Sequence, residues 1–196
     1  MAAVFALTFA NAQDTKEGSE GFSKGDLFVT GTAAYGSVTR GELKANDLTL
    51  SPGVGYFLTE NLALVGQVSI SSGKDYQDLL GDGNLYEVKT SGFGIAAGVN
   101  YYWTPASKFS LSLGGNISYN SNKQDLGGED FTSNVIGVNV PLGLHYFVSD
   151  AFAITTTWGG LGYSTDDNGG NGADKTDSLN LGLDLSSVSF GLIYKL

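Results

Sequence analysis

The sequence contains no cysteine, and it has only three prolines, one histidine and ten basic residues. Without cysteine there is no disulfide framework, thiol nucleophile or thiolate metal site. Twenty acidic residues give a formal net charge of −10, which argues against a nucleic-acid partner because phosphate backbones are bound by clustered lysine and arginine. No run of about 18 or more apolar residues follows the start of the chain, so no membrane-spanning helix is expected. No motif indicates a cofactor.

Glycine and aromatic residues are abundant instead. The 29 glycines and the 12% of aromatic residues are unusual for a helical protein. From Lys24 onward, apolar and polar residues alternate with the period of two that indicates β-strands. We therefore predict an all-β fold. Its strands are expected over residues 26–38, 47–57, 62–72, 88–103, 108–119, 134–147, 152–163 and 179–196.

Three similar segments predict how these strands are connected. Each consists of an aromatic strand end, a short polar turn and a new strand, and the aromatic residues are Phe57, Trp103 and Phe147. Longer polar segments lie between them, over residues 39–46, 73–87, 120–133 and 164–178. Alternating short turns and long loops are typical of transmembrane barrels. The sequence thus predicts a closed, antiparallel, eight-stranded up-and-down barrel, with its long loops outside the cell and its short turns in the periplasm.

The two faces of the predicted strands differ in chemistry. One face carries bulky apolar residues, and the other carries small polar residues and glycine. The interior of an eight-stranded barrel is too narrow for the bulky set, so we expect the apolar face to meet lipid, unlike in a soluble ligand-binding barrel. The predicted polar lumen residues are Gln67, Asn100, Asn116, Asn139, His145 and Asp184. The aromatic residues expected at the membrane–water interface are Tyr56, Tyr101, Trp103, Tyr146, Trp158 and Tyr194.

The last predicted strand breaks this alternation. Its apolar residues are odd-numbered up to Leu185 and even-numbered from Val188, so the faces exchange at Ser186 and Ser187. A β-bulge that inserts one residue there would restore them.

The first residues of the chain have another pattern. Residues 2–10 form a short apolar run, and Ala10-Asn11-Ala12 resembles a signal-peptide cleavage site. We expect a signal peptide over residues 1–12, truncated because its basic start is missing. A periplasmic tail over residues 13–24 and the barrel over residues 25–196 would follow.

From residue 25 onward the chain resembles the outer-membrane β-barrel domain family, the OmpA/OmpX-like eight-stranded barrels, without a periplasmic domain. The resemblance rests on the three aromatic-turn-strand segments and on the final strand, Phe190-Gly191-Leu192-Ile193-Tyr194-Lys195-Leu196. That strand is similar to the C-terminal assembly signal of such barrels, although Leu196 replaces the usual final aromatic residue. The resemblance implies an outer-membrane location, contact with outer-membrane lipid and recognition by the barrel-assembly machinery.

Two groups of residues could carry chemistry. Some eight-stranded outer-membrane barrels are lipid-modifying enzymes, but His145 is expected near the short turns and far from the outer leaflet, so we interpret it as structural. The acidic residues of the last long loop have the composition of a calcium site without the spacing of an EF-hand. They are Asp166, Asp167, Asp174 and Asp177. A solvated loop without metal is the simpler interpretation.

Three functions follow from these patterns. The first, which we predict, is a non-enzymatic barrel that has a structural role or presents acidic extracellular loops to an unidentified protein partner. The second is a narrow channel for small solutes or ions, which the many lumen glycines would allow. The third is an outer-leaflet lipid-modifying enzyme.

Overall fold

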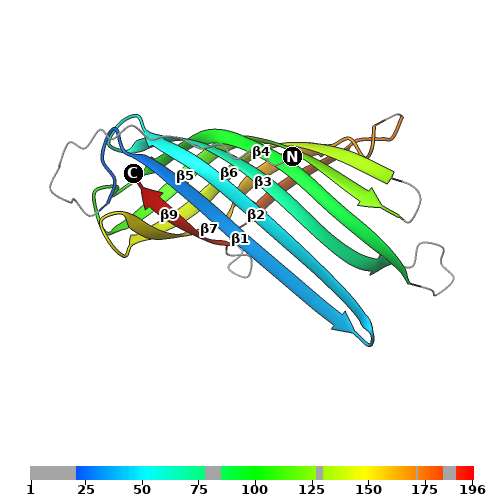
Figure 1. Ribbon diagram of the computed structural model, residues 1–196. Coiled ribbons are helices and arrows are strands. Elements are labelled where there is room, and N and C mark those ends of the chain that lie inside the picture. The colour runs from blue at the N-terminus through cyan, green and yellow to red at the C-terminus, as the bar shows by residue number, and fades with distance from the viewer. Residues whose placement is uncertain (1–20, 78–84, 127–129, 171, 183–188) are drawn as a thin grey trace, which may run out of the picture.

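A computed structural model of the chain describes residues 21–77, 85–126, 130–170, 172–182 and 189–196. Within them, nine antiparallel strands form one sheet in the order β6-β5-β4-β3-β2-β1-β9-β7-β8. β6 also pairs with β7, so the sheet closes into a barrel (Figure 1). β8 and β9 pair with successive parts of β7 and together take the place of the eighth strand. The described residues include no helix that is long and apolar enough to cross a membrane.

The strands are long, and from β1 to β7 each one pairs with the next. Their bounds are β1 (Leu27–Arg40), β2 (Leu43–Phe57), β3 (Leu62–Gln77), β4 (Tyr86–Tyr102), β5 (Phe109–Asp125), β6 (Asp130–Phe147), β7 (Phe152–Asp166), β8 (Thr176–Gly182) and β9 (Ser189–Lys195). This up-and-down order confirms the closed, eight-stranded antiparallel barrel predicted from the sequence.

The barrel has two different ends. Short turns join β2 to β3, β4 to β5 and β6 to β7, and we call this side the turn end. The connections from β1 to β2, β3 to β4, β5 to β6 and β7 to β8 lie on the opposite side, the loop end. At the loop end the strands continue into the polar segments that the sequence indicated as loops, and β3, β5 and β7 run on to Gln77, Asp125 and Asp166.

The first long loop, predicted over residues 39–46, is instead a tight hairpin, so that prediction was wrong. β1 runs to Arg40, β2 begins at Leu43, and the two residues are paired. Gly41 has a φ of 61°, and glycine at the first position of a two-residue loop is the arrangement of type II′ turns, whose twist matches that of the flanking strands. In the sequence this segment resembles a loop because both faces of these strand ends lie in water, so neither face needs apolar residues.

The outer face of the barrel is a broad apolar band. Its exposed residues include Leu48, Leu50, Val54, Leu64, Val68, Ile70, Phe93, Ile95, Val99, Leu111, Leu113, Ile117, Ile136 and Val138. All of them belong to the face that the sequence assigns to lipid, because successive residues of a strand point to opposite faces. An exposed apolar surface of this extent needs a lipid or protein environment to cover it.

The predicted exchange of faces in the last strand is present. Leu179 and Leu181 are exposed on β8, whereas Phe190 and Leu192 are exposed on β9. Residues 183–188 separate the two strands, while on β7 only Trp158 and Gly159 separate their partner residues. The insertion is therefore longer than the predicted one-residue bulge, and Asp184, Ser186 and Ser187 lie outside the described residues.

A bulge that the sequence did not predict lies in β7. The register between β6 and β7 shifts between Val140 and Leu142, so that Gly159 and Gly160 stand opposite Pro141. Gly160 has a φ of 113°, and a side chain there would collide with the Val140 carbonyl oxygen. Proline lacks the N–H that a regular ladder requires, which is why it is tolerated at such a bulge.

Val68→Arg tests the orientation of the strands. Val68 is exposed within the apolar band of β3, so arginine there should lower the unfolding free energy in lipid bilayers by about 2–4 kcal/mol if the site lies near the midplane. The matched control is Val38→Arg, because Val38 lies near the tip of the β1–β2 hairpin, beyond the band. Denaturant titration of barrels folded into vesicles measures both changes, and equal losses would contradict the assignment of the faces.

Candidate functional site

The lumen is closed at the turn end by a cluster of aromatic rings, which we call the aromatic floor. Phe28, Phe57, Tyr102 and Phe147 point inward from β1, β2, β4 and β6, and each is at most 2% exposed. The side chains packed between them are Ala63, Ala153 and Ile193. The floor gathers bulky residues on the face that is elsewhere small and polar, so it fills the barrel where short turns bring the strands to their ends.

A further ring in the floor, that of Phe22, comes from outside the barrel strands. It is fully buried, with ring-centre distances of 4.6 Å to Phe57, 4.8 Å to Phe147 and 5.2 Å to Phe28. The tail expected over residues 13–24 therefore packs into the barrel from Gly21 onward. Sequence analysis missed Phe22 because a single phenylalanine among polar residues and glycines has no periodic signal.

The backbone around Phe22 is fastened to the turn end. The Phe22 N–H donates to the Pro105 carbonyl oxygen at 2.7 Å, and the Lys195 ammonium donates to the Gly21 carbonyl oxygen at 2.7 Å. Gly21 has a φ of 99°, and a side chain there would collide with the Pro105 carbonyl. Glycine at residue 21 thus allows the chain to turn closely against the β4–β5 connection and to direct Phe22 inward.

His145 lies directly above the floor. Its Nε2 is 2.8 Å from the Ser112 hydroxyl and its Nδ1 is 2.9 Å from the Thr155 hydroxyl, and all three side chains are buried. The spacing of Ser112 and His145 is that of a nucleophile and a base, but a hydroxyl occupies the place that an orienting carboxylate takes in a catalytic triad. The Tyr102 ring, 4.9 Å away, packs on the imidazole.

The other predicted lumen residues surround the space above His145. Gln67, Asn100 and Asn116 line a cavity of about 180 Å³ together with threonines of β1 and β7. Gln67, Asn116 and Asn139 also line a second, more open cavity of about 710 Å³ nearer the loop end. The described lining of the first cavity contains no Asp, Glu, Lys or Arg side chain.

The predicted interfacial aromatics lie on the outer face towards the turn end. Tyr56, Tyr101, Trp103, Tyr146 and Tyr194 are each between 40% and 52% exposed. The side chain of Trp158 lies outside the described part of the structure. Near the loop end, a second set of outward tyrosines, Tyr35, Tyr119 and Tyr163, follows the apolar band. Aromatic side chains at both edges of an apolar band are typical of membrane barrels.

The acidic residues of the last loop do not converge on one point. Asp167 accepts hydrogen bonds at 2.8 Å from both the backbone and the side-chain amide of Asn134, Asp166 accepts one from the Asn168 N–H, and Asp177 accepts one from the Thr165 hydroxyl. Among the residues that the structure describes, no group of three or more His, Asp or Glu side chains could hold a metal ion. The hydrogen bonds from Asn134 hold the pKa of Asp167 below its ordinary value.

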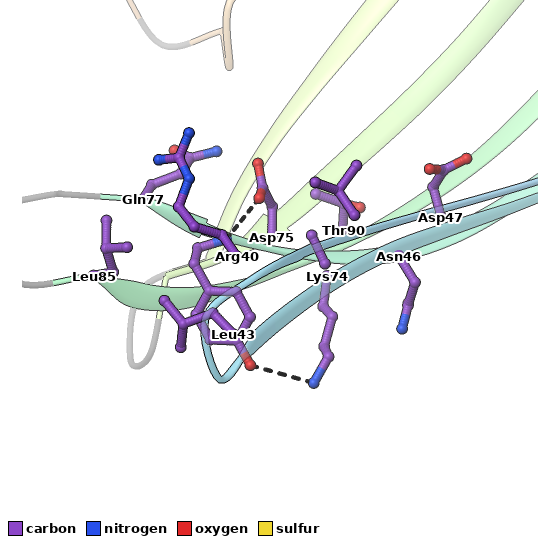
Figure 2. Close-up of a pocket in the computed structure, with 12 residues that line it drawn as sticks. Arg40, Leu43, Asn46, Asp47, Lys74, Asp75, Gln77, Leu85 and Thr90 are labelled. Atoms are coloured by element: carbon purple, nitrogen blue, oxygen red, sulfur yellow. Dashed lines mark hydrogen bonds between the residues drawn. The ribbon is translucent and has the colours of Figure 1, made fainter.

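A notch opens at the loop end where the β1–β2 hairpin diverges from β3. β2 and β3 pair only as far as Asn46 and Lys74, and beyond them a cavity of about 520 Å³ lies between the strands. Figure 2 shows Asp47 and Asp75 pointing to one side of the sheet and Lys74 to the other. The notch therefore combines polar and charged groups with apolar residues such as Leu43 and Leu85.

Asp167→Ala should increase proteolysis between residues 166 and 176, because it removes the acceptor that ties this loop to Asn134. Asp174→Ala is the control, since Asp174 contacts Asn168 through its backbone oxygen. Because the pKa of Asp167 is lowered, its carboxylate stabilises the loop fully when the pH is above the ordinary pKa of an aspartate. This stabilisation is lost as the pH falls through the lowered pKa of Asp167. Cleavage of the wild type should therefore rise only in acid, and chelation of calcium should leave it unchanged; a calcium-dependent rate would contradict this picture.

The chain matches a known family and known structures. A sequence profile of the outer membrane protein β-barrel domain matches residues 1–186. Neisserial surface protein A is 20% identical with a TM-score of 0.50, over 87% of this chain and 97% of that one. The outer membrane protein OprG from Pseudomonas aeruginosa is 16% identical with a TM-score of 0.56, over 90% and 98%. No curated protein matches. The profile match over most of the chain, on a closed barrel with an apolar outer band, shows that this chain belongs to the outer-membrane protein β-barrel domain family and resides in the outer membrane.

Proposed function

We propose that the protein is a non-enzymatic outer-membrane barrel that has a structural role in the membrane and an interaction role at the cell surface. The aromatic floor carries this proposal. With Phe22 stacked on Phe57 and packed edge-to-face against Phe147, buried rings fill the turn end of the lumen, where a channel would have to remain open. In the membrane, the turn end with Phe22 would face the periplasm and the loop end would face the outside of the cell.

The loop end supplies the interaction surface. Its strands continue beyond the outer tyrosines and carry acidic side chains into water. Those in the described residues include Glu42, Asp75, Glu87, Asp125, Asp130, Asp166, Asp167, Asp174 and Asp177. A concentrated negative surface attracts cations and the basic segments of partner proteins. The name of Neisserial surface protein A, which shares this fold, supports an exposed location. The protein partner of the acidic loop end is unidentified.

Assembly of the barrel requires its last strand. β9 pairs with β1 on one side and with β7 on the other, so the barrel is closed at the turn end only when the C-terminal residues are in place. Recognition of this strand by the barrel-assembly machinery would therefore couple delivery of the chain to closure of the sheet.

A narrow channel is the second candidate function. The two lumen cavities have Gln67, Asn116, Pro141 and Thr157 in common, so a polar space extends from above the floor towards the loop end. Movement of the floor would be needed to extend this space to the periplasm. The difference between the two functions is thus whether the floor stays in place.

Conductance across planar bilayers measures this difference. The wild-type barrel should show no unitary conductance, because the aromatic floor fills the lumen. Phe22→Ala/Phe57→Ala removes two rings whose centres are 4.6 Å apart and should allow ions to pass, whereas Phe93→Ala/Phe190→Ala removes two outward rings and should not. A conducting wild type would favour the channel.

Mass spectrometry of extracted lipids tests for an enzyme. Ser112→Ala and His145→Ala remove the pair that most resembles a nucleophile and its base, and both variants should leave outer-membrane lipid acylation as it is in the wild type. Thr155→Val is the structural control because it removes only the second hydroxyl bound to His145. Folding is checked by heat-dependent gel mobility. Altered acylation in the first two variants but not in the third would establish an enzymatic role.

A further inference from the structure

Four lysines occupy equivalent positions on four neighbouring strands, and we call them the lysine row. Along the outward-facing positions of each strand, the last large apolar residue or tyrosine is followed by serine or asparagine and then by lysine. The four series are Leu48-Asn46-Lys44 on β2, Ile70-Ser72-Lys74 on β3, Phe93-Ser91-Lys89 on β4 and Tyr119-Ser121-Lys123 on β5. The chain has ten basic residues in all, so this row holds a large share of its positive charge.

The strand register brings three of these lysines together, and Lys44 lies two residues beyond Asn46, the partner of Lys74. Lys74 and Lys89 are direct cross-strand partners, and Lys123 is paired with Ser91, the residue two positions from Lys89. Like charges placed opposite each other destabilise a sheet unless anions lie nearby. Glu87 lies 3.5 Å from the Lys74 ammonium and 3.7 Å from that of Lys89, so one carboxylate serves two cations. Asp125 is the cross-strand partner of Lys89, and Asp130 lies 2.6 Å from the Lys123 ammonium. The three lysines therefore belong to an ion-pair network on the outer face of β3 to β6.

The lysine row lies on the lipid-facing side of the barrel wall. Figure 2 shows Lys74 and Asn46 pointing away from Asp47, Asp75 and Thr90, which lie on the lumen side by their pairing. The side chains of Lys74, Lys89 and Lys123 are 34%, 67% and 49% exposed. Each ammonium has three N–H donors, and an ion pair with one carboxylate oxygen leaves donors for another acceptor.

The height of the row matches the headgroup layer. Four residues along a strand cover about 13 Å, which at a tilt of about 40° is about 10 Å above the last apolar residue. The headgroup layer is about 5–8 Å thick on each side of the bilayer. A lysine side chain can lean back towards the membrane over this difference, so its ammonium reaches the level of the lipid phosphates.

The row covers the β2–β5 side of the barrel; at the same distance beyond Leu179 of β8 lies a single lysine, Lys175, which comes after the acidic Asp177. The equivalent positions on the flanking strands are Thr39 on β1, after Tyr35 and Ser37, and Thr132 on β6, after Ile136 and Asn134. Acidic residues lie one outward position farther from the membrane, with Glu87 beyond Lys89 and Asp125 beyond Lys123. A general adjustment to the membrane surface would place basic residues around the whole barrel, whereas a one-sided cluster of cations is the arrangement of a binding site.

We propose that the lysine row on β2–β5 is a binding site for the phosphate groups of anionic outer-leaflet lipid. Adjacent ammonium groups would bind one or two phosphates from the side, through direct charge-assisted hydrogen bonds. This contact needs no divalent cation, and it does not depend on whether the lumen is closed.

The experiment compares two triple variants with the same change in charge. K74Q/K89Q/K123Q removes cations from the row, and K24Q/K108Q/K175Q removes cations elsewhere. Each full-length barrel is folded into nanodiscs of phosphatidylcholine containing a minor fraction of lipid A or phosphatidylglycerol, and native mass spectrometry measures the retained lipids. The wild type and the control should retain anionic lipid several-fold in excess of its bulk fraction. The row variant should lose this preference, and chelation with EDTA should leave the wild type unchanged.

Three outcomes would overturn the proposal. The first is equal lipid retention by the two triple variants. The second is loss of wild-type retention in EDTA, which would assign binding to cation bridges from the acidic loops. The third is displacement of the lipid by millimolar inorganic phosphate, which would indicate a general anion site. The single variant Lys89→Gln guards against misfolding, because Lys89 is the most exposed of the three lysines in the triple variant. If the proposal holds, the Lys89→Gln barrel folds as the wild type does and retains less anionic lipid. A folded Lys89→Gln barrel that retains as much anionic lipid as the wild type would also count against the row.

Discussion

The structure depends on closure of the backbone hydrogen-bond ladder. Inside a bilayer no water can satisfy a free N–H or C=O group, so a sheet that crosses it must have no open edge at that depth. Here the last strand segment, β9, pairs with β1 from Phe28 to Thr32 and with β7 from Phe152 to Thr157. Every other feature follows from the resulting cylinder, because closure assigns alternate residues of every strand to lipid or to a narrow lumen.

The narrow lumen explains both its small residues and the exception at the turn end. Where a bulky ring points inward, its cross-strand neighbour must be small: Gly55 on β2 is paired with Phe28, and a side chain at Gly55 would collide with the ring of Phe28. The ring of Phe22 fills the remaining space. The Phe22 N–H donates a hydrogen bond to the Pro105 carbonyl, and Lys195 donates one to the carbonyl of the preceding residue, Gly21. The barrel thus obtains its compact core from one end only, while polar cavities occupy the part above His145.

The outer surface is organised in bands along the membrane normal. An apolar band lies between two sets of tyrosines, and at the loop end serine and asparagine, then lysine, then acidic residues follow on β4 and β5. This order bears on the proposed lipid site because the chain as a whole has a net charge of −10. On these two strands the charges nearest to the apolar band are positive, and Glu87 and Asp125 lie one outward position farther from it.

The sequence by itself determined the fold class, the strand order and the two faces of β1 to β6, because period-two alternation is a local property that each strand carries independently. It did not reveal the bulge in β7, beyond which the exposed residues change from even-numbered to odd-numbered. It did not determine where strands end in water: residues 39–46 are polar on both faces, and only the pairing of Arg40 with Leu43 makes them a hairpin. The burial of Phe22 and the alignment of Lys74 with Lys89 were likewise decided by the tertiary structure. Contacts such as that of Phe22 with Phe147 join distant parts of the chain, and the register between strands is set by closure of the whole barrel rather than by any one segment.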